Sequence, residues 1–421
     1  MMESSDIELE WMSSEERARY YDEKVKWIVE HAYQTAPAMR EKMDKVGISP
    51  SHIQTVKDLE RIPITKKDDL IRLQKENSPF GGMLGVPVEE INRIFISPGP
   101  IYDPFGDEVY SRTARILSAM GFRKGDLVVN TFSYHLVPAG LYFHEALSKL
   151  GVTVLPTGVG NTELQLQIMR ELKATGYVGT PSFLMTLIKK AEELGYNFRK
   201  DFSIKTAYLA SEMLPQSLRE SFEKEYGINV YQAYGSADMG ITAYECSAQS
   251  GMHMAEEFLI EIVDPTSGKQ LGPGEIGEVV VTPLEKTRPL LRFGTGDLSV
   301  YTEEPCSCGR TSPRLLKITG RVGEAVKVRS MFVHPKELAD AIGKFPQIIN
   351  YRIVVNRIGH RDDVTLIIEL ESEDVDVPQL SENILKNVSE ACRVKFDRIE
   401  LLEKGTLPKE HQKIIDERTW D

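Results

Sequence analysis

Between about residues 92 and 300, the chain alternates short apolar runs with amphipathic segments of helical period. The apolar runs are four or five residues long, which is typical of buried strands, and they lie at residues 127–130, 152–155, 206–209 and 229–233. Helical patterns separate them, at residues 106–121, 137–150, 162–175, 181–194 and 215–226. Because neighbouring parallel strands need a long crossover connection, usually a helix, this alternation predicts an α/β domain with mainly parallel sheets.

The regions on either side of this domain have different patterns. Residues 14–46 are helical in pattern, whereas residues 255–300 contain alternating runs broken by Pro and Gly, which predict antiparallel β-hairpins. After Gly320 the chain has a ββαβ-like rhythm with a helix at residues 378–391. The sequence therefore predicts a large N-terminal α/β domain with a β-hairpin subdomain, residues 1–320. A small, mobile α+β C-terminal domain, residues 321–421, follows it.

Two short motifs indicate a nucleotide site. Tyr234-Gly235-Ser236-Ala237-Asp238 directly follows the strand predicted at 229–233, and Arg292-Phe293-Gly294-Thr295-Gly296-Asp297 comes about 60 residues later. Ligands of parallel sheets bind beyond the carboxyl ends of the strands, where the first motif lies. A tyrosine ring can face adenine, and a carboxylate can accept hydrogen bonds from both ribose hydroxyls. Each motif alone is more often only a turn, so the prediction rests on their order.

Composition narrows the classes of partner. The chain has 421 residues and a net charge of -12, so it lacks the basic surplus of a nucleic-acid-binding protein. It shows no signal peptide and no run of 18 uncharged apolar residues, so we expect no membrane span and a cytoplasmic location. Four cysteines do not suggest a disulfide framework. The oligomeric state stays open, with a homodimer as one option.

The two nucleotide motifs, residues 234–238 followed by residues 292–297, resemble in their order those of the adenylate-forming acyl-CoA synthetases. The N-terminal stretch, with Ala32-Tyr33, residues 46–50 and Lys67-Asp68-Asp69-Leu70, is similar to the phenylacetate–CoA ligase branch. The resemblance implies an AMP-forming acid–CoA ligase that uses ATP and Mg²⁺ to convert a carboxylic acid, expected to be aromatic, into an acyl-adenylate. The acyl group would then pass to coenzyme A while a small C-terminal domain rotates.

The resemblance also assigns roles to residues. Tyr234 would lie against adenine, Asp238 would be the metal-side carboxylate in place of the usual Glu, and Asp297 would hold the ribose. The implied nucleotide-binding set is Ser97, Gly99, Ser211, Glu212, Tyr234, Gly235, Ser236, Asp238, Asp297 and Arg321.

Catalytic candidates follow from the same resemblance. Lys413 lies eight residues after Gly405, the spacing of the adenylation lysine, although it could equally be a solvated tail lysine. Asp238 would act through the metal. His135, with Tyr134, would frame the acid, although helix capping and packing explain these two residues as well.

The phosphate loop departs from the family pattern, Ser-Ser-Gly-Thr-Thr-Gly. Residues 97–106 keep Ser97 and Gly99, but two prolines remove backbone donors, the threonines are absent and Asp103 adds a negative charge. Either the metal carries more of the phosphate binding, or ATP binds weakly, or adenylation is not the reaction. Two alternatives therefore stay open: an adenylating enzyme with another thiol acceptor, and a non-catalytic homologue that binds a nucleotide or acyl-adenylate.

A second constellation suggests a structural zinc site. Cys306-Ser307-Cys308-Gly309, together with Cys246 and His253 in a Cys-x₆-His arrangement, supplies the ligands of a closed Cys₃His site. The phenylacetate–CoA ligase branch often has such ligands. The competing interpretation is three reduced thiols and an unrelated histidine. Cys392 is isolated and is expected in a core.

Overall fold

The computed structural model describes residues 9–97, 101–322, 326–329, 331–333, 335–359, 361–371, 377–408 and 413–418. The chain divides into two compact units. The first unit is Met1–Ala210 with Glu220–Gly320, and the second is Ser211–Arg219 with Arg321–Asp421. The first unit thus ends at Gly320, where the sequence changes character, but the short segment Ser211–Arg219 groups with the second unit, which the sequence did not indicate.

Two α-helices lie near the start of the first unit, where the sequence predicted one helical stretch. α2 (Ser14–Thr35) begins with a capping box between Ser13 and Glu16, and α3 (Pro37–Asp44) follows it directly. The chain leaves the helical conformation at Ala36, because a proline at the next position disfavours it there and Pro37 lacks an N–H donor. Pro37 instead starts the new helix in its first turn. Further short helices are η1 (Leu9–Trp11), η2 (Pro50–His52), η3 (Val56–Arg61), α4 (Lys67–Glu76) and η4 (Val88–Glu90).

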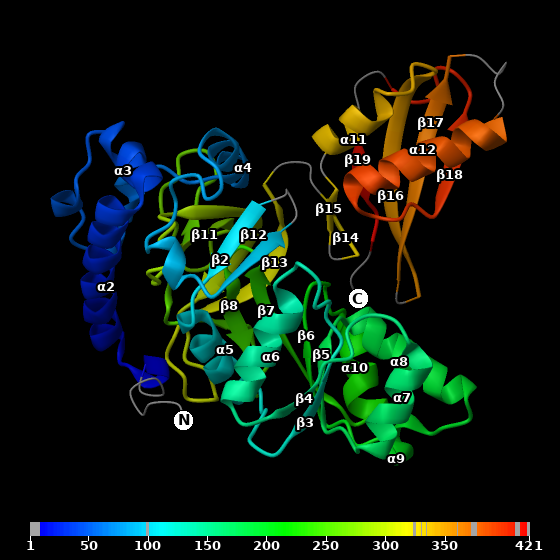
Figure 1. Ribbon diagram of the computed structural model, residues 1–421, viewed down its shortest axis with the longest axis horizontal. Coiled ribbons are helices and arrows are strands. Elements are labelled where there is room, and N and C mark those ends of the chain that lie inside the picture. Colours follow the sequence, from blue (N-terminus) through cyan, green and yellow to red (C-terminus); the bar gives the residue numbers. More distant parts are fainter. Residues whose placement is uncertain are drawn as a thin grey trace. The chain divides into compact units, whose positions relative to one another are not determined.

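The parallel half of the main sheet confirms the predicted α/β class. Its strands are β3 (Leu127–Asn130), β4 (Thr153–Leu155), β5 (Gly176–Gly179), β6 (Thr206–Leu209) and β7 (Asn229–Ser236), in the order β4-β3-β5-β6-β7. The helices that precede or separate them in the first unit lie on both sides of the strands (Figure 1): α5 (Glu108–Ala119), α6 (Ala139–Lys149), α7 (Thr162–Glu171), α8 (Pro181–Glu193), α9 (Phe198–Asp201) and η5 (Ser221–Glu225). Most of α10 (Gln216–Glu220), in the connection from β6 to β7, belongs to the second unit. β5 was not predicted, because glycine at both of its ends weakens the strand signal.

β7 joins this half to the hairpin half. It pairs in parallel with β6 over Asn229–Gln232 and antiparallel with β8 from Ala233 to Ser236. The other hairpin strands continue the same sheet, which has eleven strands in the order β10-β11-β12-β13-β9-β8-β7-β6-β5-β3-β4. They are β8 (Gly240–Glu245), β9 (Met252–Met254), β10 (Phe258–Val263), β11 (Gly277–Pro283), β12 (Phe293–Thr302) and β13 (Arg314–Arg321). A separate hairpin, β1 (Arg93–Ser97) with β2 (Ile101–Phe105), holds most of the altered phosphate stretch.

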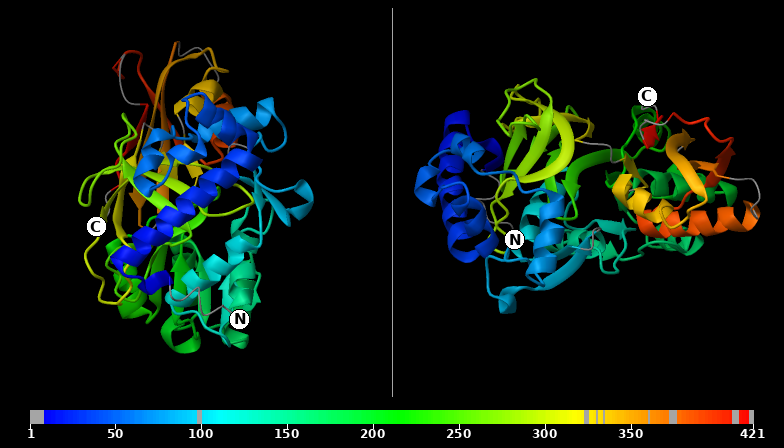
Figure 2. Two further views of the ribbon diagram at one scale, coloured as in Figure 1. Left: turned by 90° about the vertical axis from the view of Figure 1, so that its left-hand side faces the viewer. Right: turned by 90° about the horizontal axis from the view of Figure 1, so that it is seen from above.

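The second unit contains a four-stranded sheet with two helices. The sheet order is β18-β17-β16-β19, and α11 and α12 lie side by side on one face of it (Figures 1 and 2). Its core includes Leu338, Ile353, Leu366 and Ile384, all fully buried. The elements are β14 (Val326–Val328), β15 (Met331–Val333), α11 (Pro335–Ile342), β16 (Ile348–Ile358), β17 (Arg361–Leu370), α12 (Val377–Cys392), β18 (Arg398–Leu402) and β19 (Ile414–Asp416). This is the predicted α+β arrangement.

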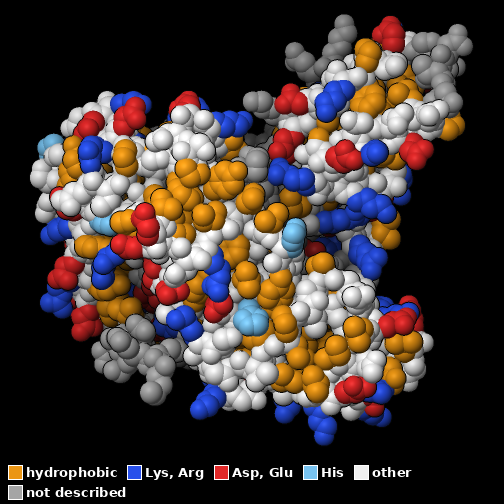
Figure 3. All heavy atoms as spheres, viewed as in Figure 1, with side chains coloured by type: hydrophobic (Ala, Val, Ile, Leu, Met, Phe, Trp, Pro, Cys, Tyr) orange, Lys and Arg blue, Asp and Glu red, His pale blue; other side chains and the backbone are white. Residues whose placement is uncertain are grey.

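The surface is mixed in character. Acidic and basic side chains are interspersed among hydrophobic ones on the face of the first unit seen in Figure 3. Among the helices that the structure describes, none is both long enough and apolar enough to cross a membrane.

Arg292, the first residue of the second motif, is buried and links separate segments of the first unit. Only 1% of its side chain is exposed, and its guanidinium forms an ion pair with Glu261, with Nη2 3.0 Å from Oε1. It also donates to the main-chain oxygens of Ile62 at 2.8 Å and Gly268 at 2.6 Å. Burial acts to raise the pKa of Glu261, and the charge of Arg292 opposes this effect. Arg292 therefore ties β10 to the segment that precedes α4.

We expect Arg292→Met to lower the free energy of unfolding of the first unit by about 3–5 kcal/mol, because it leaves the buried Glu261 carboxylate without its partner. The measurement is urea unfolding followed by tryptophan fluorescence, since Trp11 and Trp27 both lie in this unit. Lys45→Met is the control, because it removes an ion pair with Glu41 in which both side chains are more than 60% exposed. Equal unfolding midpoints for the two variants would contradict this interpretation.

Candidate functional site

The two sequence motifs meet at the ends of β7 and β12. The Tyr234 hydroxyl lies 2.8 Å from Oδ2 of Asp297 and 2.9 Å from Oγ1 of Thr295. Thr295 donates its own hydroxyl proton to the main-chain oxygen of Val279 at 2.8 Å. The carboxylate of Asp297 is thus oriented by a buried tyrosine, which is only 9% exposed. Ribose binding by Asp297 and adenine contact by Tyr234 remain predictions, but the two side chains belong to one cluster.

Glycine and serine shape the turn beside Tyr234. A Cβ atom on Gly235 would lie 2.1 Å from the main-chain oxygen of Gly240, so the β7–β8 hairpin closes only with glycine there. The buried Oγ atom of Ser236 has no hydrogen-bond partner within the described residues. A buried hydroxyl without a partner is costly, so it is a reasonable contact for a bound ligand.

Asp238 lies in the turn between β7 and β8, and its carboxylate is buried between a cation and a hydroxyl. Lys67 Nζ is 3.2 Å from Oδ2, and the Ser97 hydroxyl donates to Oδ1 at 3.5 Å. Burial acts to raise the pKa of Asp238, but the charges of Lys67 and Arg288 outweigh it and hold the pKa below its usual range. Lys67 was noted in the sequence only as part of a family-like stretch, and its contact with Asp238 spans 171 positions, so no local pattern indicates it.

The sequence suggested that Asp103 adds a negative charge to the phosphate loop. In the structure, Asp103 does not direct this charge toward a phosphate. It is fully buried and forms an ion pair with Arg288. Burial, and then the charge of Asp238, raise the pKa of Asp103, while Arg288 opposes them. The charge that was expected to repel phosphate is therefore compensated inside the protein. Ser97 is buried in the same cluster, and Gly99 lies outside the described residues.

The predicted acid-binding loop lies between β3 and α6. The Tyr134 hydroxyl accepts a hydrogen bond from Asn130 Nδ2 at 2.9 Å and lies 3.3 Å from Nδ1 of His144. His135 is exposed at the same loop, and its main-chain N–H donates to Ser133 Oγ at 3.2 Å. Leu136 has a φ of 62°, a left-handed value that is rare outside glycine. His144 therefore contacts Tyr134, whereas a role for His135 remains a prediction.

Four predicted residues, Ser211, Glu212, Arg321 and Lys413, belong to the second unit. Ser211 adopts a φ of 69°, an unusual conformation that often marks a functional segment. Lys413 Nζ donates to Asn350 Oδ1 at 2.9 Å and lies 4.6 Å from the centre of the Tyr351 ring. Burial and the nearby Arg352 lower the pKa of Lys413. The roles of these four residues toward a nucleotide stay predictions.

Cys246, His253, Cys306 and Cys308 converge, with their ligand atoms all within 4.8 Å of one another. The Sγ atoms of Cys246 and Cys306 are 3.7 Å apart, and Cys308 Sγ is 3.4 Å from His253 Nε2. A tetrahedron of sulfur ligands around zinc has edges of about 3.8 Å, so the spacing suits this metal. His253 Nδ1 lies 3.2 Å from the Ser312 main-chain oxygen, which fixes the ring with Nε2 toward the thiols. Burial lowers the pKa of His253 to about 4, so the imidazole is neutral, as a ligand must be.

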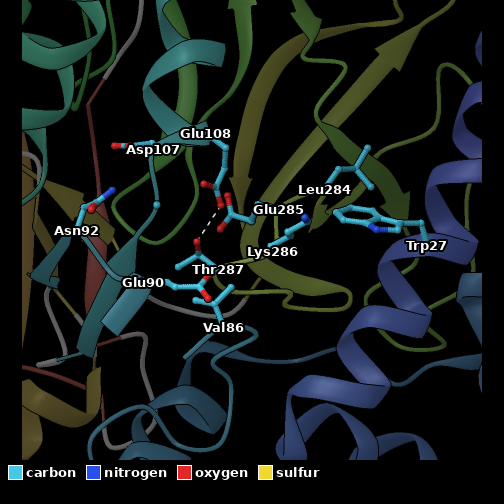
Figure 4. Close-up of a pocket in the computed structure, with 11 residues that line it drawn as sticks. Trp27, Val86, Glu90, Asn92, Asp107, Glu108, Leu284, Glu285, Lys286 and Thr287 are labelled. Atoms are coloured by element: carbon cyan, nitrogen blue, oxygen red, sulfur yellow. Dashed lines mark hydrogen bonds between the residues drawn. The ribbon is translucent and has the colours of Figure 1, made fainter. Parts of the chain in front are cut away.

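A surface cavity of about 420 Å³ lies elsewhere in the first unit (Figure 4). Trp27, Leu284 and Lys286 are at one side of it, and the Glu108–Thr287 hydrogen bond, 2.9 Å long, is at another. None of the predicted nucleotide residues lines this cavity. It is therefore not the site formed by the two motifs.

Comparison with known proteins agrees with this geometry. The sequence profile of the AMP-binding enzymes matches residues 109–283, and that of the AMP-binding enzyme C-terminal domain matches residues 330–418. A solved structure of 2-hydroxyisobutyryl-CoA ligase in complex with 2-HIB-AMP and CoA aligns with a TM-score of 0.91 at 26% identity, covering 98% of this chain and 92% of that one. The fold and these matches define an AMP-forming acyl-CoA synthetase.

Curated relatives narrow the class. The phenylacetate–coenzyme A ligase of Thermus thermophilus is 32% identical over 377 residues, covering 86% of this chain and 83% of the relative. That of Escherichia coli is 31% identical over 382 residues, covering 87% and 85%. The chain belongs to the phenylacetate–CoA ligase family of AMP-binding enzymes. The resemblance inferred from the motifs is confirmed, as is the prediction of an AMP-forming acid–CoA ligase, which uses ATP and coenzyme A.

Proposed function

We propose that the protein activates an aromatic carboxylic acid of the phenylacetate type. The Tyr234–Asp297–Thr295 cluster, which joins both nucleotide motifs by hydrogen bonds, supports the nucleotide half of this activity, and the identity of the relatives supports the aromatic acid. The relatives named above are phenylacetate–CoA ligases, and the loop predicted to hold the acid contains Tyr134 and Phe132, whose ring stacks on Phe143 of α6. A small hydroxy acid is the competing substrate, because one structural neighbour is a 2-hydroxyisobutyryl-CoA ligase.

In this proposal, the nucleotide is held mainly by its adenosine end. Asp297, oriented by Tyr234, would accept hydrogen bonds from the ribose, and Ser236 would contact the nucleotide through its buried hydroxyl. A carboxylate that attacks the α-phosphate places further negative charge on an anionic centre, so catalysis requires positioning and charge neutralisation. Lys413 would supply a positive charge for this step. Ser211, Glu212 and Arg321 would border the adenosine.

Mg²⁺ would be held by Asp238. Carboxylate and hydroxyl oxygens are the ligands that this ion prefers, and Asp238 with Ser97 offers both kinds. When bound, Mg²⁺ neutralises phosphate charge. Lys67 contributes a further cation next to the same carboxylate. These groups would take over part of the binding for which residues 97–106 lack donors.

The cysteine–histidine cluster would hold a structural zinc ion. Its four ligands come from the hairpin half of the sheet, in and around β8, β9 and the connection from β12 to β13. Because all four positions are filled by protein groups, the metal would stabilise the fold rather than bind substrate. The cytoplasmic location also remains a prediction.

The substrate is tested by ATP–pyrophosphate exchange with phenylacetate, benzoate, 2-hydroxyisobutyrate and acetate, followed by mass detection of the CoA thioester. We expect kcat/KM for phenylacetate to exceed that for acetate by at least about 100-fold, since burying an aromatic ring contributes several kcal/mol. A preference for 2-hydroxyisobutyrate would reject the aromatic acid. Exchange without thioester would indicate a different acceptor.

Lys413→Met is expected to slow adenylation by about 100-fold or more, because a charge at the α-phosphate is lost. The measurement is ATP–pyrophosphate exchange alongside thioester formation from a synthetic acyl-adenylate, which should change little. Lys404→Met serves as the control, since Lys404 forms an exposed ion pair with Glu371 in the same unit. If both half-reactions fell equally in Lys413→Met, the lysine would have a structural role instead.

Protein purified without chelator should contain about one zinc ion per chain. Cys308→Ala and His253→Ala should lose this zinc and lower the unfolding temperature, whereas Cys392→Ala, which removes a thiol outside the cluster, should retain it. Atomic emission on each variant makes the comparison. A content under about 0.3 zinc per chain in the unmodified protein is too low for a structural site and would reject it.

A further inference from the structure

Two buried arginines hold the turn that carries Asp238. One guanidinium nitrogen of Arg288 donates to the carboxylate of Asp103, and another donates to the main-chain oxygen of Asp238. Arg112 likewise contacts one acid and one main-chain oxygen, that of the residue after Asp238. Its Nη1 is 2.8 Å from Oε2 of Glu285, and its Nη2 donates to the main-chain oxygen of Met239 at 2.9 Å. Consecutive carbonyls of one turn are thus held by two arginines, each fixed by its own acid.

These contacts are enclosed in the protein. The side chains of Arg288 and Asp103 are 3% and 0% exposed, and those of Arg112 and Glu285 are 5% and 9% exposed. Buried ion pairs are costly to desolvate and often stabilise no better than apolar residues of the same volume. Stability therefore does not explain why two such ion pairs surround one turn. The geometry that they impose on the main chain of the turn explains it better. A planar guanidinium suits this task because its donors have a fixed fork arrangement.

The main chain of the turn and the Asp238 side chain have different partners. The arginines hold its main chain, while the Asp238 carboxylate meets Lys67 and Ser97. The anchors are also linked in sequence, because Glu285 and Arg288 both lie in the short connection between β11 and β12. That connection thereby fixes one carbonyl directly through Arg288 and the next through the Glu285–Arg112 pair. Rotation of the turn would break one of these contacts.

We propose that Arg288 and Arg112, held by Asp103 and Glu285, are positioning residues for the Asp238 carboxylate. They supply, from inside the protein, rigidity at the phosphate end, where residues 97–106 lack the threonines of the family loop and two prolines remove backbone donors. This proposal rests on the metal-side role proposed for Asp238. Neither arginine needs to touch the nucleotide, because each acts through the main chain of the turn.

The test separates the two half-reactions. Arg288→Lys and Arg112→Lys keep the charge, but an ammonium group cannot reproduce the fork contact with a carboxylate and a carbonyl. We expect kcat/KM for MgATP in ATP–pyrophosphate exchange to fall between about tenfold and 100-fold, because misplacement by a fraction of an ångström impairs a reacting geometry. The Mg²⁺ concentration for half-maximal exchange should rise. Thioester formation from a synthetic acyl-adenylate, which requires no metal-bound triphosphate, should stay within about twofold.

Arg17→Lys is the matched control. Arg17 forms a buried ion pair with Glu256 at 3.3 Å and donates to a main-chain oxygen, that of Leu9, in another part of the first unit. It should lower stability without altering the Mg²⁺ dependence. If an arginine variant of the turn fails to fold, Asp103→Asn, which keeps the shape of the side chain and removes its charge, replaces it with the same expected result.

Two outcomes would overturn the proposal. One is an unchanged Mg²⁺ dependence in Arg288→Lys and Arg112→Lys. The other is an equal loss of both half-reactions, because that pattern would indicate a merely structural role. Asp238→Asn distinguishes failure of the underlying function: if it too leaves the Mg²⁺ dependence unchanged, Asp238 is not the metal-side carboxylate. If only Asp238→Asn changes it, the carboxylate has its role and the arginines do not position it.

Discussion

The double pairing of β7 is the constraint on which the site depends. Its N-terminal half pairs in parallel with β6 and completes the parallel strands, and its C-terminal half pairs with β8 and begins the antiparallel hairpins. Tyr234 lies on the second half, and the turn that follows carries Asp238. The same continuous sheet brings β12, with Asp297, to a hydrogen-bond distance of 2.8 Å from the Tyr234 hydroxyl. One strand therefore connects the ribose-binding and metal-side residues of the proposed site.

Charge compensation explains how an acidic protein could accommodate a nucleotide at the proposed site. Asp103, Asp238 and Glu285 are buried near one another in the fold, and each meets an arginine or lysine in the first unit. The low dielectric of the interior makes each pairing obligatory, because an unpaired buried charge is costly. The altered loop is consistent with this arrangement: its aspartate is an internal partner of Arg288 rather than a group that faces phosphate.

Local patterns in the sequence predicted the α/β class, most of the parallel strands and the cysteine–histidine cluster, because apolar periodicity and metal-ligand chemistry are local signals. β5 was missed because its glycines give little strand signal. The β1–β2 hairpin was taken as a loop. Contacts that span most of the first unit, such as Arg288 with Asp103, have no local signature, and so the actual environment of Asp103 could not be predicted. The sequence placed Arg292 in a nucleotide motif, but its buried guanidinium instead forms an ion pair with Glu261 that stabilises the fold.

We propose that Asp297 and Asp238 mark the ribose and metal ends of one nucleotide site. The most direct measurement is a crystal structure of the protein with Mg²⁺ and an ATP analogue whose α,β-bridging oxygen is replaced by methylene. We expect ribose hydroxyls within about 3.2 Å of the Asp297 carboxylate and the metal beside Asp238. A nucleotide bound in the cavity around Trp27 and Glu108, or a triphosphate held without Asp238, would contradict it.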